Sequence, residues 1–264
     1  MPNPRVLTIA GSDPSGGAGI QGDLKTITMH DCYGMAVITA LTVQNTQGVT
    51  GVMQIPGDFI ASQIDAVLTD IPADAIKTGM LGDRAAVEAV CRALKGANAR
   101  NVVVDPVMIA KGGHELIREN AIAAIKSELF PLAELVTPNL DEVAALVGRK
   151  PQNEKEMEEA AREIARFGCR AVLVKGGHLE GSNEAIDLLY TSDGFSRFAM
   201  PRLNVKNTHG TGCALSAAIA ATLAKGYGLI EAVSEAKQFV YSAIERSYQI
   251  GHGIGPLNHL WSAE

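Results

Sequence analysis

Residues 134–178 read ELVTPNLDEVAALVGRKPQNEKEMEEAAREIARFGCRAVLVKGGH and contain two strand-like runs separated by two helix-like segments. The runs at 134–137 and 171–175 lack polar alternation, which is typical of strands that are buried on both faces. Between them, residues 139–147 and 154–167 are amphipathic and long enough for helices. This order predicts a crossover unit of a parallel sheet, and therefore an α/β fold.

The same alternation continues on both sides of that segment. Further buried-strand runs are expected at 6–10, 36–43 and 101–105. Further helices are expected at 18–32, 58–70, 83–96, 117–129 and 229–249. Residues 186–200 form two apolar runs around Ser192-Asp193-Gly194 and predict a hairpin. No polar linker or extra block of strands interrupts the pattern. We therefore predict a single domain over residues 1–264, with a mostly parallel sheet between helices and no separate lid domain.

The composition excludes several classes of protein. The chain has 264 residues and a net charge of −6, from 29 acidic and 23 basic residues, and it has no basic run. Binding to nucleic acid or to an anionic membrane is therefore not expected. The four cysteines form no C-x-x-C pair, which argues against a metal cluster or a disulfide framework. No apolar run approaches the ~18 residues of a membrane span, so a cytoplasmic protein is expected.

The strongest local motif is Asn207-Thr208-His209-Gly210-Thr211-Gly212-Cys213, which precedes a long Ala-rich segment. Two glycines followed by a helix N-terminus, with its unpaired N–H groups and positive dipole end, suit an anion such as phosphate. A plain helix start after a flexible turn is the alternative. The thiol of Cys213 would lie in the first helical turn, where its pKa is expected to fall below the ordinary value. Cys213 could then serve as a base or a nucleophile.

A second glycine-rich loop, residues 11–23, follows the first expected strand. Gly17, Gly19 and Gly22 match G-x-G-x-x-G, the dinucleotide fingerprint. The first glycine comes seven residues after the strand, and no acidic residue ends the second strand, so an NAD oxidoreductase is disfavoured. A loop at the carboxyl end of a strand suits a role in covering a substrate. A tight turn with a helix cap at Ser15 is the alternative.

Polar side chains end or follow three later strands. Asp105 follows one strand, Asn139 and Glu142 follow the next, and Lys175 ends a third. Each could have a local role, and Asn139 with Glu142 has the spacing of a capping box. Together they would place carboxylate, amide and ammonium groups at one edge of the sheet. Carboxylates near phosphates suit Mg²⁺, and a lysine suits phosphate charge.

Seven motifs occur in an order that resembles the hydroxymethylpyrimidine/phosphomethylpyrimidine kinase family. They are GSDPSGGAGIQGD (11–23), ITALTVQNTQGV (38–49), KTGML (77–81), VVVDPVMIAKGG (102–113), VTPNLDEV (136–143), VLVKGGH (172–178) and NTHGTGC (207–213). The likeness extends to GHGIGPLNH (251–259). It implies a ribokinase-like fold, Mg²⁺ with ATP, and two successive phosphorylations of 4-amino-5-hydroxymethyl-2-methylpyrimidine in thiamine biosynthesis. It also suggests a homo-oligomer, such as a dimer. No Walker A motif is present, so the phosphates need a different cradle.

The resemblance implies a role for each matching residue. The expected anion hole and activating residue are Gly210, Thr211, Gly212 and Cys213. The expected supports of Mg²⁺, directly or through water, are Asp105 and Glu142. The residues expected to face the nucleotide phosphates are Asn139, Lys175 and His209. The residues expected to line the pyrimidine pocket are Gly11, Asp23, Gln44, Met80 and Val107.

Two rival functions share these motifs. A pyridoxal or pyridoxine kinase would have the same phosphate site, and the ring pocket discriminates between the two. The amide of Gln44 offers a donor and an acceptor, which match the amine and adjacent ring nitrogen of an aminopyrimidine. A catalytically silent ligand-binding protein on this fold is the other rival. The presence of Cys213, Asp105 and Lys175 argues against it.

Overall fold

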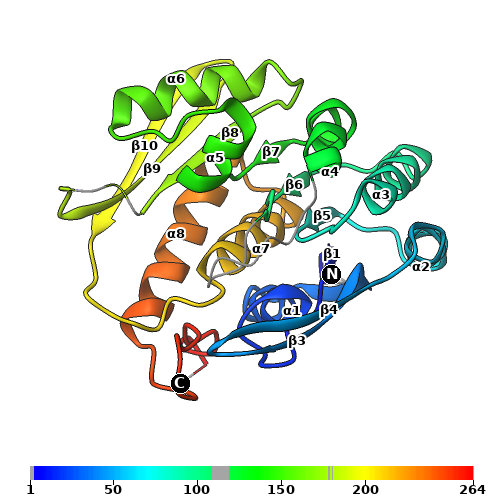
Figure 1. Cartoon of the computed structure of the whole chain (residues 1–264), viewed down its shortest axis with the longest axis horizontal. Coiled ribbons are helices and arrows are strands. Elements are labelled where there is room, and N and C mark those ends of the chain that lie inside the picture. The colour runs from blue at the N-terminus through cyan, green and yellow to red at the C-terminus, as the bar shows by residue number, and fades with distance from the viewer. Residues whose placement is uncertain (1–2, 109–118, 178, 180, 264) are drawn as a thin grey trace.

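The computed structural model describes residues 3–263 except 109–118, 178 and 180 (Figure 1). The first two residues of the helix expected at 117–129, residues 109–113 of VVVDPVMIAKGG, and His178 of VLVKGGH lie outside the described residues. In the described part of the chain, no helix is both long and apolar enough to cross a membrane.

An eight-stranded sheet forms the centre of the molecule, in the order β10-β9-β8-β7-β6-β5-β1-β2. Six neighbouring strands are parallel to one another: β8, β7, β6, β5, β1 and β2. The remaining two, β9 and β10, are antiparallel to their neighbours. Their bounds are β1 (Arg5–Ala10), β2 (Tyr33–Ile38), β5 (Ala75–Thr78), β6 (Val102–Val104), β7 (Leu135–Val136), β8 (Val172–Gly176), β9 (Glu184–Thr191) and β10 (Gly194–Pro201). The α/β prediction and the hairpin at 186–200 are confirmed.

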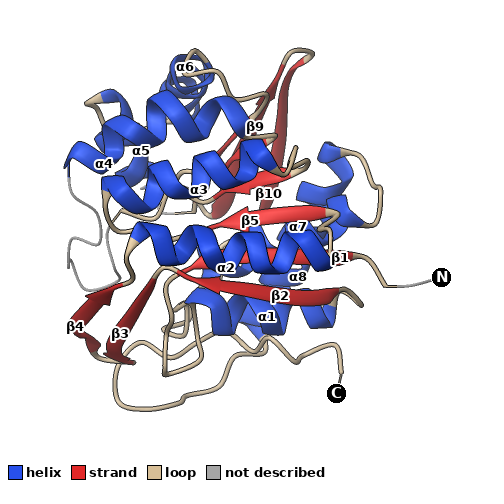
Figure 2. Cartoon of the chain, turned by 90° about the vertical axis from the view of Figure 1, so that its right-hand side faces the viewer, coloured by secondary structure: helices blue, strands red, loops and turns tan. Residues whose placement is uncertain are grey.

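Helices cover both faces of this sheet (Figures 1 and 2). One face carries α1 (Gly19–Met29), α7 (Thr211–Ala224) and α8 (Leu229–Glu245). The other carries α2 (Gly57–Asp70), α3 (Arg84–Gly96), α4 (Glu119–Ala124), α5 (Leu140–Val147) and α6 (Glu154–Ala165). Two short helical turns, Ile125–Leu129 and Phe130–Leu132, follow α4. Each face has its own apolar core, so the sheet lies between two layers.

Helix α7 is the most deeply buried element near the site. Every residue from Ala214 to Leu223 is buried, because α7 packs against the sheet on one side and against α1 and α8 on the others. Its alanines allow this close packing, since a larger side chain would hold the helix away from its neighbours. The N-terminus of α7 is thereby fixed at the carboxyl ends of the central strands.

The prediction of one strand over residues 36–43 is wrong, because this stretch belongs to two strands, β2 and β3 (Ala40–Asn45). The chain breaks at Thr39, whose hydroxyl donates to the carbonyl of Met80 at 2.6 Å. Beyond this point β3 pairs with β4 (Gly48–Gln54) in a separate two-stranded sheet. Periodicity could not show the break, because the apolar run continues through it.

The position of β1 in the sheet determines where a ligand can bind. From β1 the chain crosses to β2 on one side and later to β5 on the other. In open α/β sheets, ligands bind at such a switch point, in the crevice beyond the carboxyl ends of the strands. The polar residues that were predicted at the strand ends, Asp105, Asn139, Glu142 and Lys175, meet at this crevice.

Candidate active site

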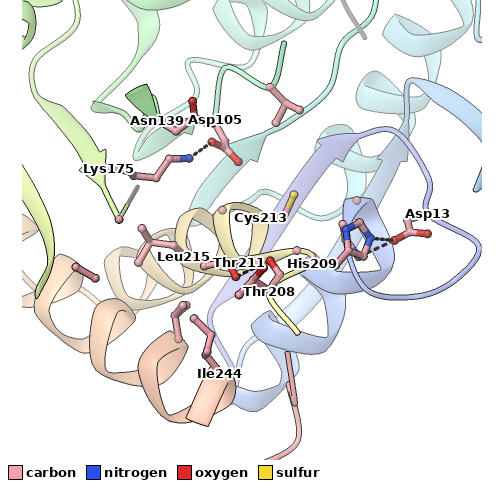
Figure 3. Close-up of a pocket in the computed structure, with 18 of the residues that line it drawn as sticks. Asp13, Asp105, Asn139, Lys175, Thr208, His209, Thr211, Cys213, Leu215 and Ile244 are labelled. Carbon is pink, nitrogen blue, oxygen red and sulfur yellow. Dashed lines mark hydrogen bonds and ion pairs between the residues drawn. The ribbon is translucent and has the colours of Figure 1, made fainter. Parts of the chain in front are cut away.

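A cavity of about 390 Å³ opens at the carboxyl ends of the parallel strands (Figure 3). It receives side chains from the loop after β1, from β3, from the ends of β5 to β8, and from the start of α7. Of the predicted site residues, those that line it are Gly11, Gln44, Met80, Asp105, Val107, Asn139, Glu142, Lys175, His209, Gly210, Thr211, Gly212 and Cys213. Asp23 does not line it.

One end of the cavity, which we call the cationic end, is organised around Lys175 of β8. Its Nζ lies 2.8 Å from Oδ1 of Asp105 and 3.9 Å from Oε2 of Glu142. The hydroxyl of Thr137 donates to the same Asp105 oxygen at 3.2 Å. Burial alone would lower the pKa of Lys175, but the two carboxylates outweigh it and raise that pKa. The ammonium therefore stays charged beside the space where a ligand anion would lie.

Asn139 and Glu142 form a capping box at the start of α5. The side chain of Asn139 accepts from the backbone N–H of Glu142 at 2.9 Å, and Glu142 Oε2 accepts from the N–H of Asn139 at 2.7 Å. Both residues also line the cavity, so the cap leaves them accessible to a ligand. Burial raises the pKa of Glu142 to about 7, against the opposing effect of Lys175.

The donor set at this end fits Mg²⁺ better than a metal held by protein alone. Among the described residues, no three His, Cys, Asp or Glu side chains gather closely enough to hold a metal. Asp105 and Glu142 approach the same ammonium, so they could share a cation that also binds phosphate oxygens and water. Magnesium takes one or two carboxylates in this way and keeps several waters.

The N-terminus of α7 directly adjoins the cationic end. Gly210 precedes the helix with φ of +82°, where a side chain would be strained and would overlap the carbonyl of Gly17. A Cβ at Gly212 would lie 3.2 Å from Lys175 Nζ and 3.8 Å from Asp105 Oδ2. Gly210 is therefore required by its backbone conformation and by close approach, whereas a Cβ at Gly212 would crowd the Lys175 ammonium. The positive end of α7 adds to that ammonium.

Cys213 lies half-buried in the cavity wall near the N-terminus of α7. The expected low thiol pKa is wrong for this structure, because burial raises the pKa of Cys213 to about 11. Lys77 opposes that rise, whereas Asp23 and Asp105 add to it. The position in the first helical turn does not outweigh the desolvation of the thiolate.

A buried ion pair near the cavity wall was not predicted from the sequence. Lys77 of β5 places its Nζ 2.8 Å and 3.0 Å from the two carboxylate oxygens of Asp23. Thr8 donates to one of those oxygens at 2.6 Å, and neither charged side chain is exposed to water. Lys77 lines the cavity, so Asp23 stands behind its wall and not in it. The signal in the sequence was a lysine inside the apolar run AIKT (75–78).

A second group of lining residues, which we call the ring end, consists of Gln44, Met80, Val107 and Gly11. Gln44 is half-buried on β3, and its Oε1 accepts from the hydroxyl of Thr42 at 3.3 Å. A Cβ at Gly11 would lie 3.1 Å from the sulfur of Met80, so the glycine keeps this end open. Apolar walls with one amide suit a flat, polar-edged ring.

His209 belongs to the ring end, which differs from its expected place at the nucleotide phosphates. Its Nε2 lies 2.8 Å from Oδ2 of Asp13 (Figure 3). The same nitrogen lies 3.4 Å from Nε2 of Gln44. Burial acts to raise the pKa of Asp13, but hydrogen bonds from His209 and Ser15 lower it overall. Ser15 donates its hydroxyl to Asp13, and α1 begins only at Gly19, so the alternative interpretation of Ser15 as a helix cap is wrong.

The C-terminal motif GHGIGPLNH closes the ring end from outside. Ile254 donates its backbone N–H to the carbonyl of Thr46 at 2.9 Å, and His209 donates its own to the carbonyl of Gly255 at 3.0 Å. A Cβ at Gly253 would overlap the backbone of Thr46. This segment therefore ties the β3–β4 turn to the start of α7. Neither contact was foreseen, because they join residues about 50 and 200 positions apart.

Comparison with known proteins agrees with this geometry. The pattern of the phosphomethylpyrimidine kinase family matches residues 13–258. The thiamine biosynthesis bifunctional protein ThiED of Geobacter sulfurreducens is 50% identical over all of this chain, which spans 54% of that protein. The hydroxymethylpyrimidine/phosphomethylpyrimidine kinase of Escherichia coli is 48% identical, with 96% of each chain covered. The ADP complex of Bacillus subtilis pyridoxal kinase has a TM-score of 0.92 at 37% identity, with 99% of each chain covered.

Proposed function

The chain belongs to the phosphomethylpyrimidine kinase family, and from that premise we propose how the two ends of its cavity divide the reaction. Its activity is that of a hydroxymethylpyrimidine/phosphomethylpyrimidine kinase, a phosphotransferase of thiamine biosynthesis that uses ATP. The cationic end holds the ATP phosphates, and the ring end binds the pyrimidine. One observation carries this division: the same cavity is lined by Lys175, by Cys213 and by Gln44, and Gln44 lies 3.4 Å from His209, which is away from the Lys175–Asp105 pair (Figure 3).

At the cationic end, charge and position do most of the work. Lys175 binds nucleotide phosphate oxygens, and Asn139 lies beside it at the start of α5. Asp105 and Glu142 would hold Mg²⁺, directly or through water. Magnesium, when bound with ATP, neutralises negative charge on the phosphates. Without a cation, the two carboxylates would repel the nucleotide, and Lys175 offsets only part of their charge.

Phosphoryl transfer then takes place at the N-terminus of α7. The hydroxymethyl oxygen forms a bond to the γ-phosphorus while the bond from that phosphorus to the ADP oxygen breaks. The backbone N–H groups from Gly210 to Cys213 stabilise the charge that spreads over the transferred group. The hydroxyl proton passes to the sulfur of Cys213. Because the thiol of the free protein is protonated at neutral pH, Cys213 first releases its own proton to water, and the thiolate then accepts the hydroxyl proton.

The second phosphorylation needs less from Cys213. Its nucleophile is a phosphate oxygen of the monophosphate, which carries negative charge at neutral pH and has little need of a base. Positioning by Lys175 and the α7 N-terminus suffices. The two steps therefore share the cationic end and differ in their dependence on the thiol.

At the ring end, the amide of Gln44 pairs with the amine and adjacent nitrogen of the pyrimidine, between Met80 and Val107. Phosphorylation of pyridoxal is a second candidate activity, since a pyridoxal kinase shares the architecture at 37% identity. A coupled assay tests both, with ATP and, in parallel, the aminopyrimidine alcohol, its monophosphate and pyridoxal. We expect kcat/KM to be highest for the two pyrimidines. A higher value for pyridoxal would overturn the ring assignment.

The assembly and location of the protein are part of the proposal. We place it in the cytoplasm as a single domain that forms a homodimer. One face of the β3–β4 sheet turns Thr42 and Gln44 to the cavity, and the opposite face exposes Leu41, Val43 and Met53. Burying these side chains against a second copy would remove apolar surface from water. Sedimentation of the wild type and of Val43→Asp tests this, and an unchanged monomer in both contradicts it.

A further inference from the structure

Lys77 is an unusual residue for the middle of a parallel sheet. Its side chain is fully buried, and it occupies β5, between β1 and β6. An ammonium at this depth is costly unless it is paired and hydrogen-bonded. An aliphatic residue would fill a sheet core more cheaply. The proposed roles of the cationic end and the ring end do not use the charge of Lys77.

The pairing of Lys77 is tightly constrained. Both oxygens of Asp23 contact its Nζ, and Thr8 holds Asp23 from the other side. A Cβ at Gly79 would lie 2.8 Å from that Nζ, so a side chain at this position would displace the ammonium. The charges are therefore held in fixed positions, hidden from solvent screening.

The elements that carry the pair, β5 and α1, both pack against α7, which carries Cys213. Lys77 and Cys213 line the same cavity, and α7 also packs against β1. The charged groups that act on this thiol come from several elements: Lys77 of β5 favours the thiolate, whereas Asp23 of α1 and Asp105 after β6 oppose it. Lys175 of β8 is also within electrostatic reach of Cys213.

We propose that Lys77 and Asp23 are positioning residues that set how readily Cys213 loses its proton, Lys77 promoting the thiolate and Asp23 restraining it. This rests on the proposed role of Cys213 as proton acceptor. A thiol in the cavity wall must be unreactive in the free enzyme and able to ionise during the first phosphorylation. A fixed cation that is largely neutralised by its own carboxylate satisfies both conditions, because its net effect on the thiol is small until a ligand changes the balance of charge.

The test measures the alkylation of Cys213 by iodoacetamide in the ligand-free protein, at fixed pH near 8.5, with the modified peptide quantified by mass spectrometry. Only the thiolate reacts, so the rate follows the thiolate fraction. Asp23→Asn should raise the rate about tenfold or more, and Lys77→Met should lower it by a similar factor. Each tenfold change corresponds to one pKa unit. The opposite signs of the two rate changes are decisive, because damage to packing would not be expected to raise the alkylation rate in one variant and lower it in the other.

A matched control comes from another buried pair in the same cavity. Lys237 and Asp187 lie 2.6 Å apart and line the cavity, but their charges are not among those that chiefly shift the Cys213 pKa. Lys237→Met should leave the alkylation rate within about twofold of wild type. If Lys77→Met does not fold, the double variant Lys77→Met/Asp23→Leu removes both charges and should react more slowly than Asp23→Asn.

Three results overturn the proposal: rate changes of the same sign in both single variants, changes below twofold, or an equal change in Lys237→Met. Failure of the proposed function gives a different signature. If Cys213→Ala still phosphorylates the alcohol at the wild-type rate while the two alkylation shifts appear, Cys213 is not the proton acceptor, and the charge relation between the pair and the thiol stands.

Discussion

The two ends of the cavity are built from different kinds of structure. At the cationic end, Asp105, Glu142 and Lys175 follow or end neighbouring strands, and the sheet fixes their separation. At the ring end, Gln44 comes from a small hairpin and His209 from the approach to α7, and a C-terminal segment joins the two. In the proposed assignment, the chemistry common to all substrates therefore stands on the sheet, and selectivity stands on the β3–β4 hairpin and the loops around it.

This difference explains how related enzymes can act on different rings. A loop can be altered with little effect on the core, whereas a strand end cannot. The Bacillus subtilis pyridoxal kinase keeps the architecture at 37% identity. We expect such enzymes to retain the cationic end and to differ mainly around Gln44, His209 and the β3–β4 turn.

The largest effect is expected at the boundary between the two ends. Cys213→Ala should reduce the first phosphorylation by about 100-fold or more, the usual size of general-base assistance. The second phosphorylation should fall much less, because its nucleophile is already charged. Steady-state kinetics on the alcohol and the monophosphate measure the split. Equal losses on both would show that Cys213 serves packing and not proton transfer.

The contributions of Glu142, at the cationic end, and Asp13, at the ring end, to the unfolding free energy should change with pH in opposite directions. The pKa of Glu142 is raised to about 7, so its stabilising contribution is present below about pH 4.5 and is lost as pH rises through 7. The pKa of Asp13 is lowered, so its contribution is present above its ordinary pKa and is lost as pH falls through the lowered value.

Urea unfolding of the ligand-free protein measures this. Between pH 5 and 8, wild type should lose roughly 1–3 kcal/mol of unfolding free energy relative to Glu142→Gln. Asp13→Asn should be less stable than wild type at neutral pH and should approach it in acid. If the unfolding free energies of wild type and both variants changed with pH in the same way, Glu142 and Asp13 would not contribute oppositely to stability, and the prediction would be contradicted.

A smaller effect concerns the metal. Asp105→Asn should raise the Mg²⁺ concentration for half-maximal rate about tenfold, because it removes one of two carboxylates that could hold the ion. Gln44→Leu, at the other end, should leave that concentration unchanged. Magnesium titrations at saturating ATP compare the two variants. If the rate of Asp105→Asn depends on Mg²⁺ concentration as the wild-type rate does, Asp105 does not hold the metal and serves only as the ion-pair partner of Lys175.

The sequence predicted the cationic end better than the ring end for a physical reason. Asp105, Asn139 and Lys175 follow buried apolar runs, and parallel strands bring their carboxyl ends together. Nothing local in the sequence places His209 against Asp13, because that contact depends on how a loop and a helix start pack across 196 positions. The break at Thr39 was hidden within an apolar run.

Lys77 and Cys213 show a second limit of reading a sequence. A short strand that contains a lysine resembles a loop, so neither β5 nor its charge was predicted. The thiol pKa was expected to fall because only the helix N-terminus was visible. Desolvation and the carboxylates of Asp23 and Asp105 are set by tertiary packing, and they reverse the sign.

Calorimetry in a crossed design tests the central claim, that one cavity has a phosphate end and a ring end. Wild type, Gln44→Leu and Lys175→Met are each titrated with the aminopyrimidine alcohol and with a non-hydrolysable ATP analogue. Gln44→Leu should weaken the alcohol by at least about tenfold, since polar groups left unpaired cost about 1–3 kcal/mol each, and leave the nucleotide within twofold. Lys175→Met should do the reverse. A comparable loss of both ligands in either variant would contradict the division of the cavity.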